Sequence, residues 1–133
     1  MCIRDRENKQ KNWDAFYAGV GDDAIHEPVA EVLHRMTAEP LYYKVLFITG
    51  RPERCRADTV RWLETNTLLW AADYSLYMRK DGDFRADYIV KQEILDAHID
   101  KDRVLFVLDD RKQVVDMWRR NGLVCFQVAE GDF

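Results

Sequence analysis

The sequence has few of the residues that build disulfide-rich or zinc-bound scaffolds. Its three cysteines, Cys2, Cys55 and Cys125, are widely spaced and odd in number, and no CxxC pair occurs. This pattern argues against a disulfide framework and against a zinc site. We therefore expect a protein of a reducing, cytoplasmic environment.

Long apolar runs and an excess of one charge are also missing. No run approaches the roughly 18 residues needed to span a bilayer, and the opening MCIRDRENKQK has no segment of signal-peptide type. With 20 basic and 24 acidic residues the net charge is −4, so no overall field attracts nucleic acid or a membrane. Any polyanionic ligand must therefore meet a local basic patch.

At 133 residues the chain has the length of one folded domain with one core. Residues 1–11 are polar and aperiodic, and we interpret them as a segment outside the domain or as a truncated beginning. Residues 12–133 are then the predicted domain.

Helix and strand patterns alternate along this domain. Helices are predicted at about His26–Met36, Pro52–Asn66, Ile89–Leu95 and Lys112–Asn121, the last with Gly122 as its C-terminal cap. Short β-rich runs predict strands at Tyr43–Ile48, Ser75–Met78, Val104–Leu108 and Leu123–Val128. The first helix should be half-buried through Val29, Val32, Leu33 and Met36. The order predicts an α/β sandwich around a mainly parallel sheet with right-handed crossovers.

The end of the first strand has features of an anion site. Thr49, Gly50 and Arg51 follow Ile48 and should form a loop that leads into a helix. Backbone N–H groups at such a junction favour an anion, and glycine allows its close approach. An ordinary tight turn is the alternative.

Two adjacent carboxylates, Asp109 and Asp110, follow the apolar run VLFVL. Unpaired charge at the end of a buried strand is costly, and a hard cation such as Mg²⁺ would relieve it. Because strand side chains alternate, one carboxylate should meet the metal while the other braces loops or backbone. A helix cap is the alternative.

Lys91 lies early in the third helix, beside its apolar stripe. A lysine there can bridge a phosphate oxygen and a nucleophilic carboxylate. Helical spacing alone favours a solvated surface lysine.

In this chain order Thr49, Lys91 and the Asp109–Asp110 pair resemble motifs two, three and four of the haloacid dehalogenase (HAD) phosphohydrolase superfamily. The segments VLFITGRPERCRADTVRWL, LYMRKDGDFRADYIVKQEIL and VLFVLDDRKQVVDMWRRNGLVCFQVAEGDF are similar to the 3′-phosphatase domain of phage and bacterial polynucleotide kinase. The resemblance implies a HAD-like Rossmannoid three-layer sandwich.

The resemblance also implies roles for single residues. Thr49 would bond the transferred phosphoryl group, and Gly50 and Arg51 would lie beside it. Lys91 would neutralise the charges of phosphoryl group and nucleophile, and Asp109 or Asp110 would complete a magnesium shell. Arg79 and Arg111 match arginines of the family's site, where the planar guanidinium suits phosphate. Without the resemblance, Arg111 reads equally well as an ion-pair partner of nearby acids and Arg79 as a solvated loop charge.

The first motif of the superfamily is not found. It is a strand that ends in Asp-x-Asp, whose first aspartate attacks phosphorus and whose second is the general acid and base. Asp81-Gly82-Asp83 has the spacing but follows no buried strand. We therefore expect the central first strand, between the Tyr43–Ile48 and Val104–Leu108 strands, to be absent from the chain. No G-x-x-x-x-G-K-[ST] loop occurs, so no 5′-kinase activity is expected of this chain.

The expected activity of the intact domain is magnesium-dependent removal of a 3′-phosphate from a DNA or RNA end. The nucleophile would lie outside this chain, which would be inactive alone and would work beside a kinase or ligase domain. A phosphatase for small phosphoesters is one alternative. A phosphoacceptor receiver is another, but it would place its acid pair before Thr and Lys. The third is a non-catalytic nucleic-acid-binding remnant that retains Arg79, Lys80, Arg85 and Arg111.

Overall fold

The computed structural model describes residues 26–67 and 74–132. The chain divides into an N-terminal unit that ends at Gly82 and a C-terminal unit that begins at Asp83. The described residues form four α-helices and two two-stranded sheets, and both sheets are parallel. The predicted α/β class with parallel strands is therefore confirmed.

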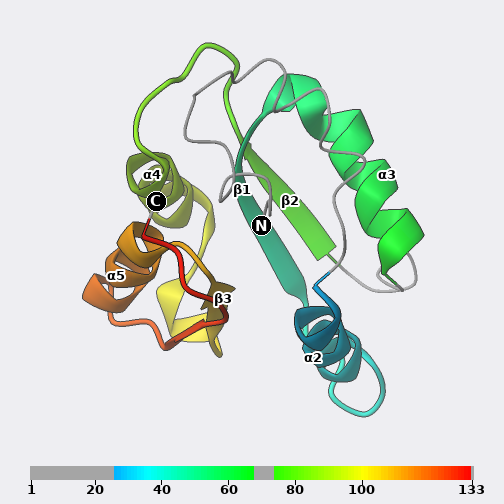
Figure 1. The fold of residues 1–133 in the computed structure, drawn as a ribbon. Helices are drawn as coiled ribbons and strands as arrows, with labels where there is room; N and C mark the ends of the chain where they lie inside the picture. The colour runs from blue at the N-terminus through cyan, green and yellow to red at the C-terminus, as the bar shows by residue number, and fades with distance from the viewer. Residues whose placement is uncertain (1–25, 68–73, 133) are drawn as a thin grey trace. The chain divides into compact units, whose positions relative to one another are not determined.

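The N-terminal unit contains α2 (Glu27–Thr37), β1 (Val45–Pro52), α3 (Arg56–Asn66) and β2 (Tyr74–Arg79). β1 and β2 lie side by side, with α3 beside them (Figure 1). Their register pairs Val45 with Tyr74 and Thr49 with Met78. The rings of Phe47 and Tyr74 meet edge to face with centroids 5.8 Å apart, which adds to the pairing of the strands.

Helix α2 confirms the predicted helix and most of its half-buried face. Pro28 lies in its first turn, where no intrahelical N–H bond is lost. Ala30 is the buried residue of the helix, whereas Val32 is 40% exposed. The expected burial of Val32 is therefore wrong, whereas Val29, Leu33 and Met36 are half-buried as predicted.

Strand β1 begins later and ends later than predicted. Tyr43 precedes it and is 44% exposed, while Thr49, Gly50 and Arg51 belong to the strand instead of a loop. The strand continues because β2 still offers a partner, with Pro52 opposite Arg79 after an irregularity that follows Thr49. A 3₁₀ turn at Glu53–Cys55 then leads into α3, so the helix proper begins at Arg56.

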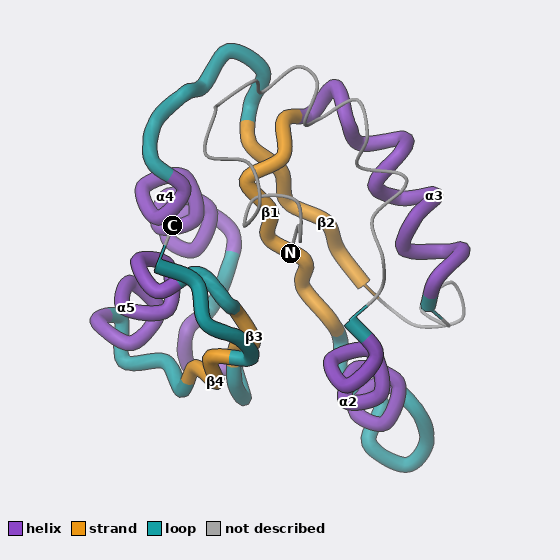
Figure 2. The backbone as a smooth tube through the Cα atoms, in the orientation of Figure 1, coloured by secondary structure: helices purple, strands orange, loops and turns teal. Residues whose placement is uncertain are grey.

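The C-terminal unit contains α4 (Asp87–His98), β3 (Val107–Asp109), α5 (Lys112–Arg120) and β4 (Cys125–Gln127). Figure 2 shows α4 and α5 packed beside each other, with the two short strands next to them. Val114, Val115 and Leu95 are at most 1% exposed and form the centre of this unit's core. Gly122, with φ +82°, allows the left-handed backbone that ends α5, which confirms the predicted cap.

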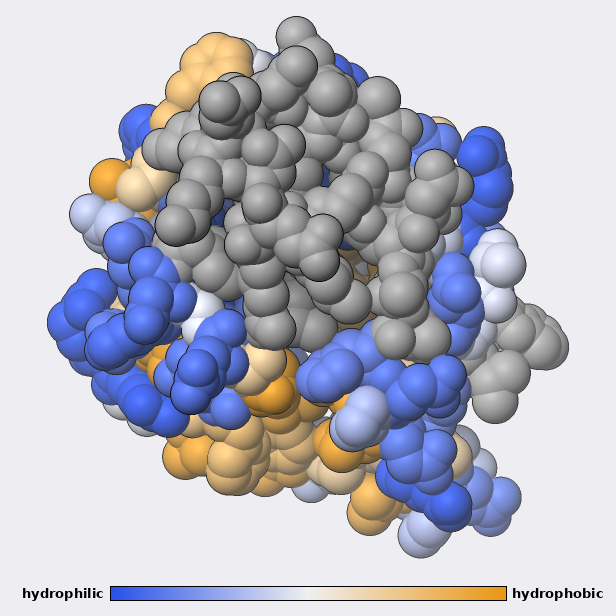
Figure 3. All heavy atoms as spheres, viewed as in Figure 1, coloured by the Kyte–Doolittle hydropathy of each residue, from blue (hydrophilic) through white to orange (hydrophobic). Residues whose placement is uncertain are grey.

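The two strands of this unit are shorter than their apolar runs. In the part of the chain described, β3 pairs only with the three residues of β4. The strand predicted at Val104–Leu108 is therefore Val107–Asp109, and the strand predicted at Leu123–Val128 is Cys125–Gln127. The expected burial of the Val104–Leu108 strand is realised only in part, because Leu105 is exposed and the other residues of the run are half-buried. Leu105, Val124 and Phe126 are 51–57% exposed, and Figure 3 shows hydrophobic side chains gathered over these strands.

None of the described helices is long and apolar enough to cross a membrane. The prediction that residues 1–11 lie outside the domain concerns residues beyond the described ranges. That a further central strand belongs between the Tyr43–Ile48 and Val104–Leu108 strands stays a prediction.

Candidate functional site

Lys91 is held inside the C-terminal unit. Its side chain is 9% exposed, and its Nζ lies 3.1 Å from Oδ2 of Asp109 and 3.5 Å from Oδ2 of Asp87. The expectation of a solvated lysine, drawn from helical spacing alone, is wrong. Two carboxylates from different elements surround the ammonium, and burial of a charge requires such partners.

Asp109 accepts four hydrogen bonds. Its Oδ2 accepts from Nζ of Lys91 and from Nε1 of Trp118, at 3.1 and 3.2 Å. Its Oδ1 accepts from the backbone N–H groups of Asp110 and Arg111, at 2.9 and 3.2 Å. The second pair satisfies backbone donors of the turn before α5. No side chain caps α5 at Arg111, so Asp109 braces the turn and does not act as the helix cap that was the alternative.

The two charged partners shift each other's titration. Burial by itself would raise the pKa of Asp109, but the charge of Lys91 and the hydrogen bond from Trp118 outweigh it, so the pKa lies below its ordinary value. Burial would lower the pKa of Lys91, but the charges of Asp87 and Asp109 outweigh it and raise the pKa. Both groups are therefore charged throughout the neutral range.

Asp110 follows at the end of β3 and is 6% exposed. Its carbonyl oxygen accepts a hydrogen bond from Nε2 of Gln127 at 3.3 Å, which holds this turn against the end of β4. The structure thus brings Asp109, Asp110 and Lys91 together, as predicted from their motifs.

Asp87 is the residue of this group that the sequence analysis missed. It begins α4, and its Oδ2 lies 3.5 Å from Nζ of Lys91 and 3.7 Å from Nη1 of Arg111. An acid four residues before a lysine on one helix face is a signal that could have revealed it. Arg111 thus pairs with Asp87, an acid far from it in the sequence, which the expectation of an ion pair with its neighbours Asp109 and Asp110 did not include.

Thr49, Gly50, Arg51 and Arg79 form a second group, in the N-terminal unit. They lie at the carboxyl ends of β1 and β2, which the parallel register brings to one edge. Oγ1 of Thr49 accepts from the backbone N–H of Arg51 at 3.2 Å, and Nε of Arg79 donates to the carbonyl of Gly50 at 2.8 Å. Arg51 is only 9% exposed, so its charge is held close to the strand ends.

Neither described Asp-x-Asp sequence has the setting of a nucleophile. Oδ1 of Asp81 accepts from the backbone N–H of Arg54, and Asp83 pairs with Arg85, so both acids of this pair hold loop structure. A second instance, Asp100-Lys101-Asp102, was overlooked in the sequence. It forms a 3₁₀ turn in which Oδ1 of Asp100 accepts from the backbone N–H of Asp102.

In residues 26–67 and 74–132, no group of three or more His, Cys, Asp or Glu side chains could hold a metal ion. The donor set at the end of β3 nevertheless fits magnesium, which takes one or two protein carboxylates with water and phosphate oxygens. Zinc favours cysteine and histidine ligands, whereas this donor set consists of carboxylates. The described cysteines Cys55 and Cys125 are buried and form no disulfide. Burial raises the pKa of both thiols, to about 11 for Cys125.

The chain as a whole matches a known family. Residues 5–133 match the family model described as the polynucleotide kinase PNKP phosphatase domain. The chain belongs to this family. The sequence-based resemblance is therefore confirmed at the level of the PNKP phosphatase domain.

Solved structures agree with the PNKP phosphatase assignment. A chain in "Structure of the Pnkp1/Rnl/Hen1 RNA repair complex" is 38% identical, with a TM-score of 0.78 over 96% of this chain and 39% of that chain. A chain in "Structure of Pnkp1/Rnl/Hen1 complex" is 40% identical, with the same TM-score over 95% of this chain and 42% of that chain.

A curated relative is similar over a shorter stretch. The "Putative bifunctional polynucleotide kinase/RNA ligase" of Autographa californica nuclear polyhedrosis virus is 34% identical over 76 residues, 56% of this chain and 11% of the viral protein. The chain thus spans less than half the length of each of these three relatives.

Proposed function

We propose that this chain is part of a magnesium-dependent polynucleotide 3′-phosphatase. The proposal rests above all on the buried Lys91–Asp109 ion pair with Asp110 beside it, at the end of a parallel strand, in a member of the PNKP phosphatase family. The substrate is the 3′-phosphate of a DNA or RNA end, and the products are a 3′-hydroxyl and inorganic phosphate.

The nucleophile is an aspartate of an Asp-x-Asp strand that this chain does not supply. Its carboxylate attacks phosphorus, the bond from phosphorus to the 3′-oxygen breaks, and the second aspartate protonates the departing oxygen. Water then hydrolyses the aspartyl-phosphate. Thr49 and Arg51 hold the phosphoryl oxygens, and Arg79 adds a planar donor at the same edge.

Charge balance is the argument for magnesium. Lys91 and Arg111 are opposed by Asp87, Asp109 and Asp110, so this group has a net negative charge and repels a phosphate. A divalent cation reverses that sign and supplies Lewis-acid stabilisation of the transferred phosphoryl group. Magnesium fits this site without a cage of three side chains.

Asp110 is the carboxylate we assign to the metal. Asp109 already accepts four hydrogen bonds, including two from Lys91 and Trp118, so its oxygens are committed to bracing the turn. Asp110 is the next residue and directly follows the end of β3. Lys91 then fixes Asp109 and presents its charge beside the reacting group.

A strand that ends in Asp-x-Asp, joined ahead of residue 1, should restore activity. We expect this chain alone to release no phosphate from a 3′-phosphorylated oligonucleotide, and the joined protein to exceed it by at least about 10³-fold, because the nucleophile dominates such chemistry. Phosphate release measured with magnesium tests this. A joined strand ending in Asn-x-Asn is the matched control. Turnover by the chain alone at the rate of the joined protein would contradict the proposal.

The joined protein should prefer a polymer end over a small phosphoester. Arg79 and Lys80 lie at the end of β2, where they can meet the phosphates that precede the terminal one. We expect a higher kcat/KM for a 3′-phosphorylated oligonucleotide than for a nucleoside 3′-monophosphate. The preference should fall about tenfold between 50 and 200 mM salt, as for a few phosphate contacts. Equal kcat/KM values at both salt concentrations would favour a phosphatase for small phosphoesters. Salt-dependent binding without turnover would favour a non-catalytic remnant.

A further inference from the structure

Phe84 is the most exposed large hydrophobic side chain of the described residues. It is 82% exposed, compared with 68% for Tyr42 and 54% for Phe126. Isolated apolar residues on a surface are common and need no function. Phe84 differs from such residues in two respects. Hydrogen bonds restrain the residues on both sides of it, and its loop connects directly to α4, which carries Asp87 and Lys91.

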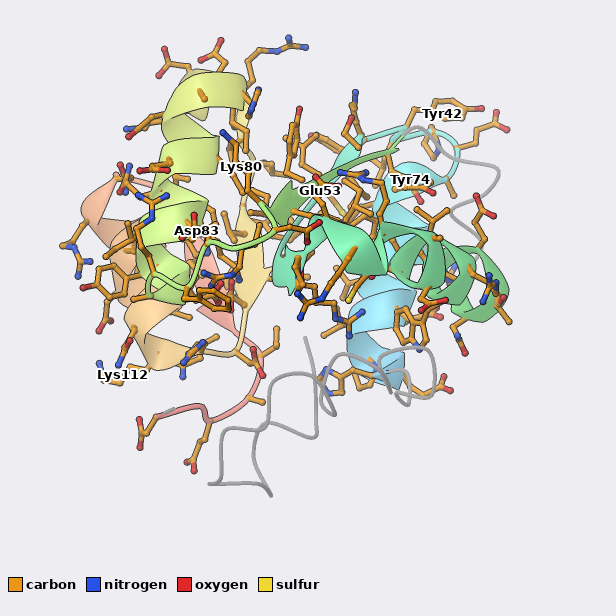
Figure 4. All side chains as sticks on the ribbon, turned by 90° about the horizontal axis from the view of Figure 1, so that it is seen from above. Tyr42, Glu53, Tyr74, Lys80, Asp83 and Lys112 are labelled. Carbon is orange, nitrogen blue, oxygen red and sulfur yellow. The ribbon has the colours of Figure 1, made fainter. Side chains whose placement is uncertain are left out.

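The backbone on both sides of Phe84 is restrained. Asp83, labelled in Figure 4, accepts from the backbone N–H of Arg85 at 3.1 Å and from its guanidinium at 2.8 and 3.0 Å. The same guanidinium donates to Oε2 of Glu93, on α4, at 2.7 Å. Single exposed ion pairs contribute little, but this arginine joins the loop to a helix through two carboxylates. The ring of Phe84 is therefore exposed on a loop whose backbone is held by Asp83 and by the bond of Arg85 to α4.

The loop that bears Phe84 leads directly to the C-terminal group of site residues. Asp87 lies three residues later at the start of α4, and Lys91 lies one turn beyond it. Chain geometry limits the distance between the Cα atoms of Phe84 and Lys91 to about 17 Å. Stacked nucleotides rise about 3.4 Å each along a strand, so the ring is within reach of the last few nucleotides of a bound end.

We infer that Phe84 is a stacking platform for a nucleobase close to the 3′ end of the polynucleotide. This inference rests on the proposed function. An exposed ring offers its face to any base, which gives affinity without sequence preference, and such stacking is worth about 1–3 kcal/mol per base. The base must be unpaired on the stacked face, so the site takes a single-stranded or frayed end. A phosphate ester without a base gains nothing from Phe84.

The test is binding of a 3′-phosphorylated single-stranded oligonucleotide to the full chain, measured by fluorescence anisotropy with magnesium. Phe84→Ala should weaken binding about tenfold, the lower part of the range for one stacked base, while Phe84→Trp stays within about twofold of wild type. Tyr42→Asn, at another exposed aromatic with positive φ, is the matched control and should leave binding unchanged. Competition by inorganic phosphate should be the same for all variants.

Oligonucleotides with a single abasic site identify the stacked base. At one position near the 3′ end the abasic substitution should weaken wild-type binding about tenfold and Phe84→Ala binding no further. Equal binding by wild type and Phe84→Ala, additive losses at every position, or no oligonucleotide binding at all would overturn the inference. If wild type binds 3′-hydroxyl and 3′-phosphate ends equally while the Phe84 effect persists, the stacking role stands and the proposed 3′-phosphatase function fails.

Discussion

Asp110→Asn is expected to abolish phosphatase activity while leaving the fold intact. The test uses the chain joined to an Asp-x-Asp strand, with phosphate release from a 3′-phosphorylated oligonucleotide as the readout. We expect a loss of at least about 10²–10³-fold, since the variant removes the carboxylate that we assign to magnesium. Asparagine keeps the size of the side chain, so unfolding by urea should begin at nearly the same concentration as in wild type.

Asp109→Asn provides the contrast. It removes the negative partner of buried Lys91, and loss of one member of a buried pair costs about 3 kcal/mol. This variant should therefore lose activity and stability together. Asp116→Asn is the matched control, because Asp116 forms an exposed i,i+4 pair with Lys112 that contributes little.

Removal of metal ions should further distinguish the roles of Asp109 and Asp110. Excess chelator should stop wild-type turnover, and added magnesium should restore it. A high magnesium concentration should partly restore the activity of Asp110→Asn if this variant is inactive because it binds the metal weakly. It should not restore the activity of Asp109→Asn. Full wild-type turnover in excess chelator would refute the magnesium assignment. Loss of stability in Asp110→Asn but not in Asp109→Asn would exchange the roles of the two carboxylates.

Lys91→Met should destabilise the chain most strongly at neutral pH. The variant leaves the carboxylates of Asp87 and Asp109, only 12% and 11% exposed, without the cation between them. We expect a fall of about 3 kcal/mol in the free energy of unfolding at pH 7. Activity should fall at least about 10²-fold, because a positioned charge beside the reacting phosphoryl group is lost.

The stability loss caused by Lys91→Met should depend on pH, because the substitution changes the pKa of Asp109. In wild type the lowered pKa of Asp109 adds stability above the ordinary carboxyl pKa, and that stability disappears as pH falls through the lowered value. In Lys91→Met the burial of Asp109 remains while the attraction is gone, so its pKa rises instead. As the pH falls, protonation of Asp109 therefore reduces the loss of stability in the variant.

The difference in unfolding free energy between wild type and Lys91→Met should therefore shrink between pH 7 and pH 4. Urea unfolding followed by circular dichroism at several pH values measures it. Lys112→Met, which removes an exposed lysine of α5, should change stability by less than about 0.5 kcal/mol at every pH. A Lys91→Met difference that is constant with pH would show that the buried ion pair does not account for the loss.

Element order and motif positions were predictable from the sequence because they depend on local patterns. Helices α2, α3, α4 and α5 lie where apolar spacing and breakers such as Pro28 and Gly122 placed them. Continuous apolar runs between these helices indicated parallel strands, and the acids and Thr49 at the ends of those runs indicated the site. The family followed from the same blocks, because their order along the chain is itself part of the motif.

Strand bounds and the state of each charged side chain depended on contacts between elements far apart in the sequence. β1 continues to Pro52 because β2 pairs with it, and β3 is short because β4 is. Helical spacing favoured a solvated Lys91, yet its buried ammonium pairs with Asp87 and Asp109. The sequence by itself determined the order of the motifs along the chain. The tertiary structure decided which charged side chains pair and in which direction their pKa values shift, because both depend on partners that only folding brings within hydrogen-bond distance.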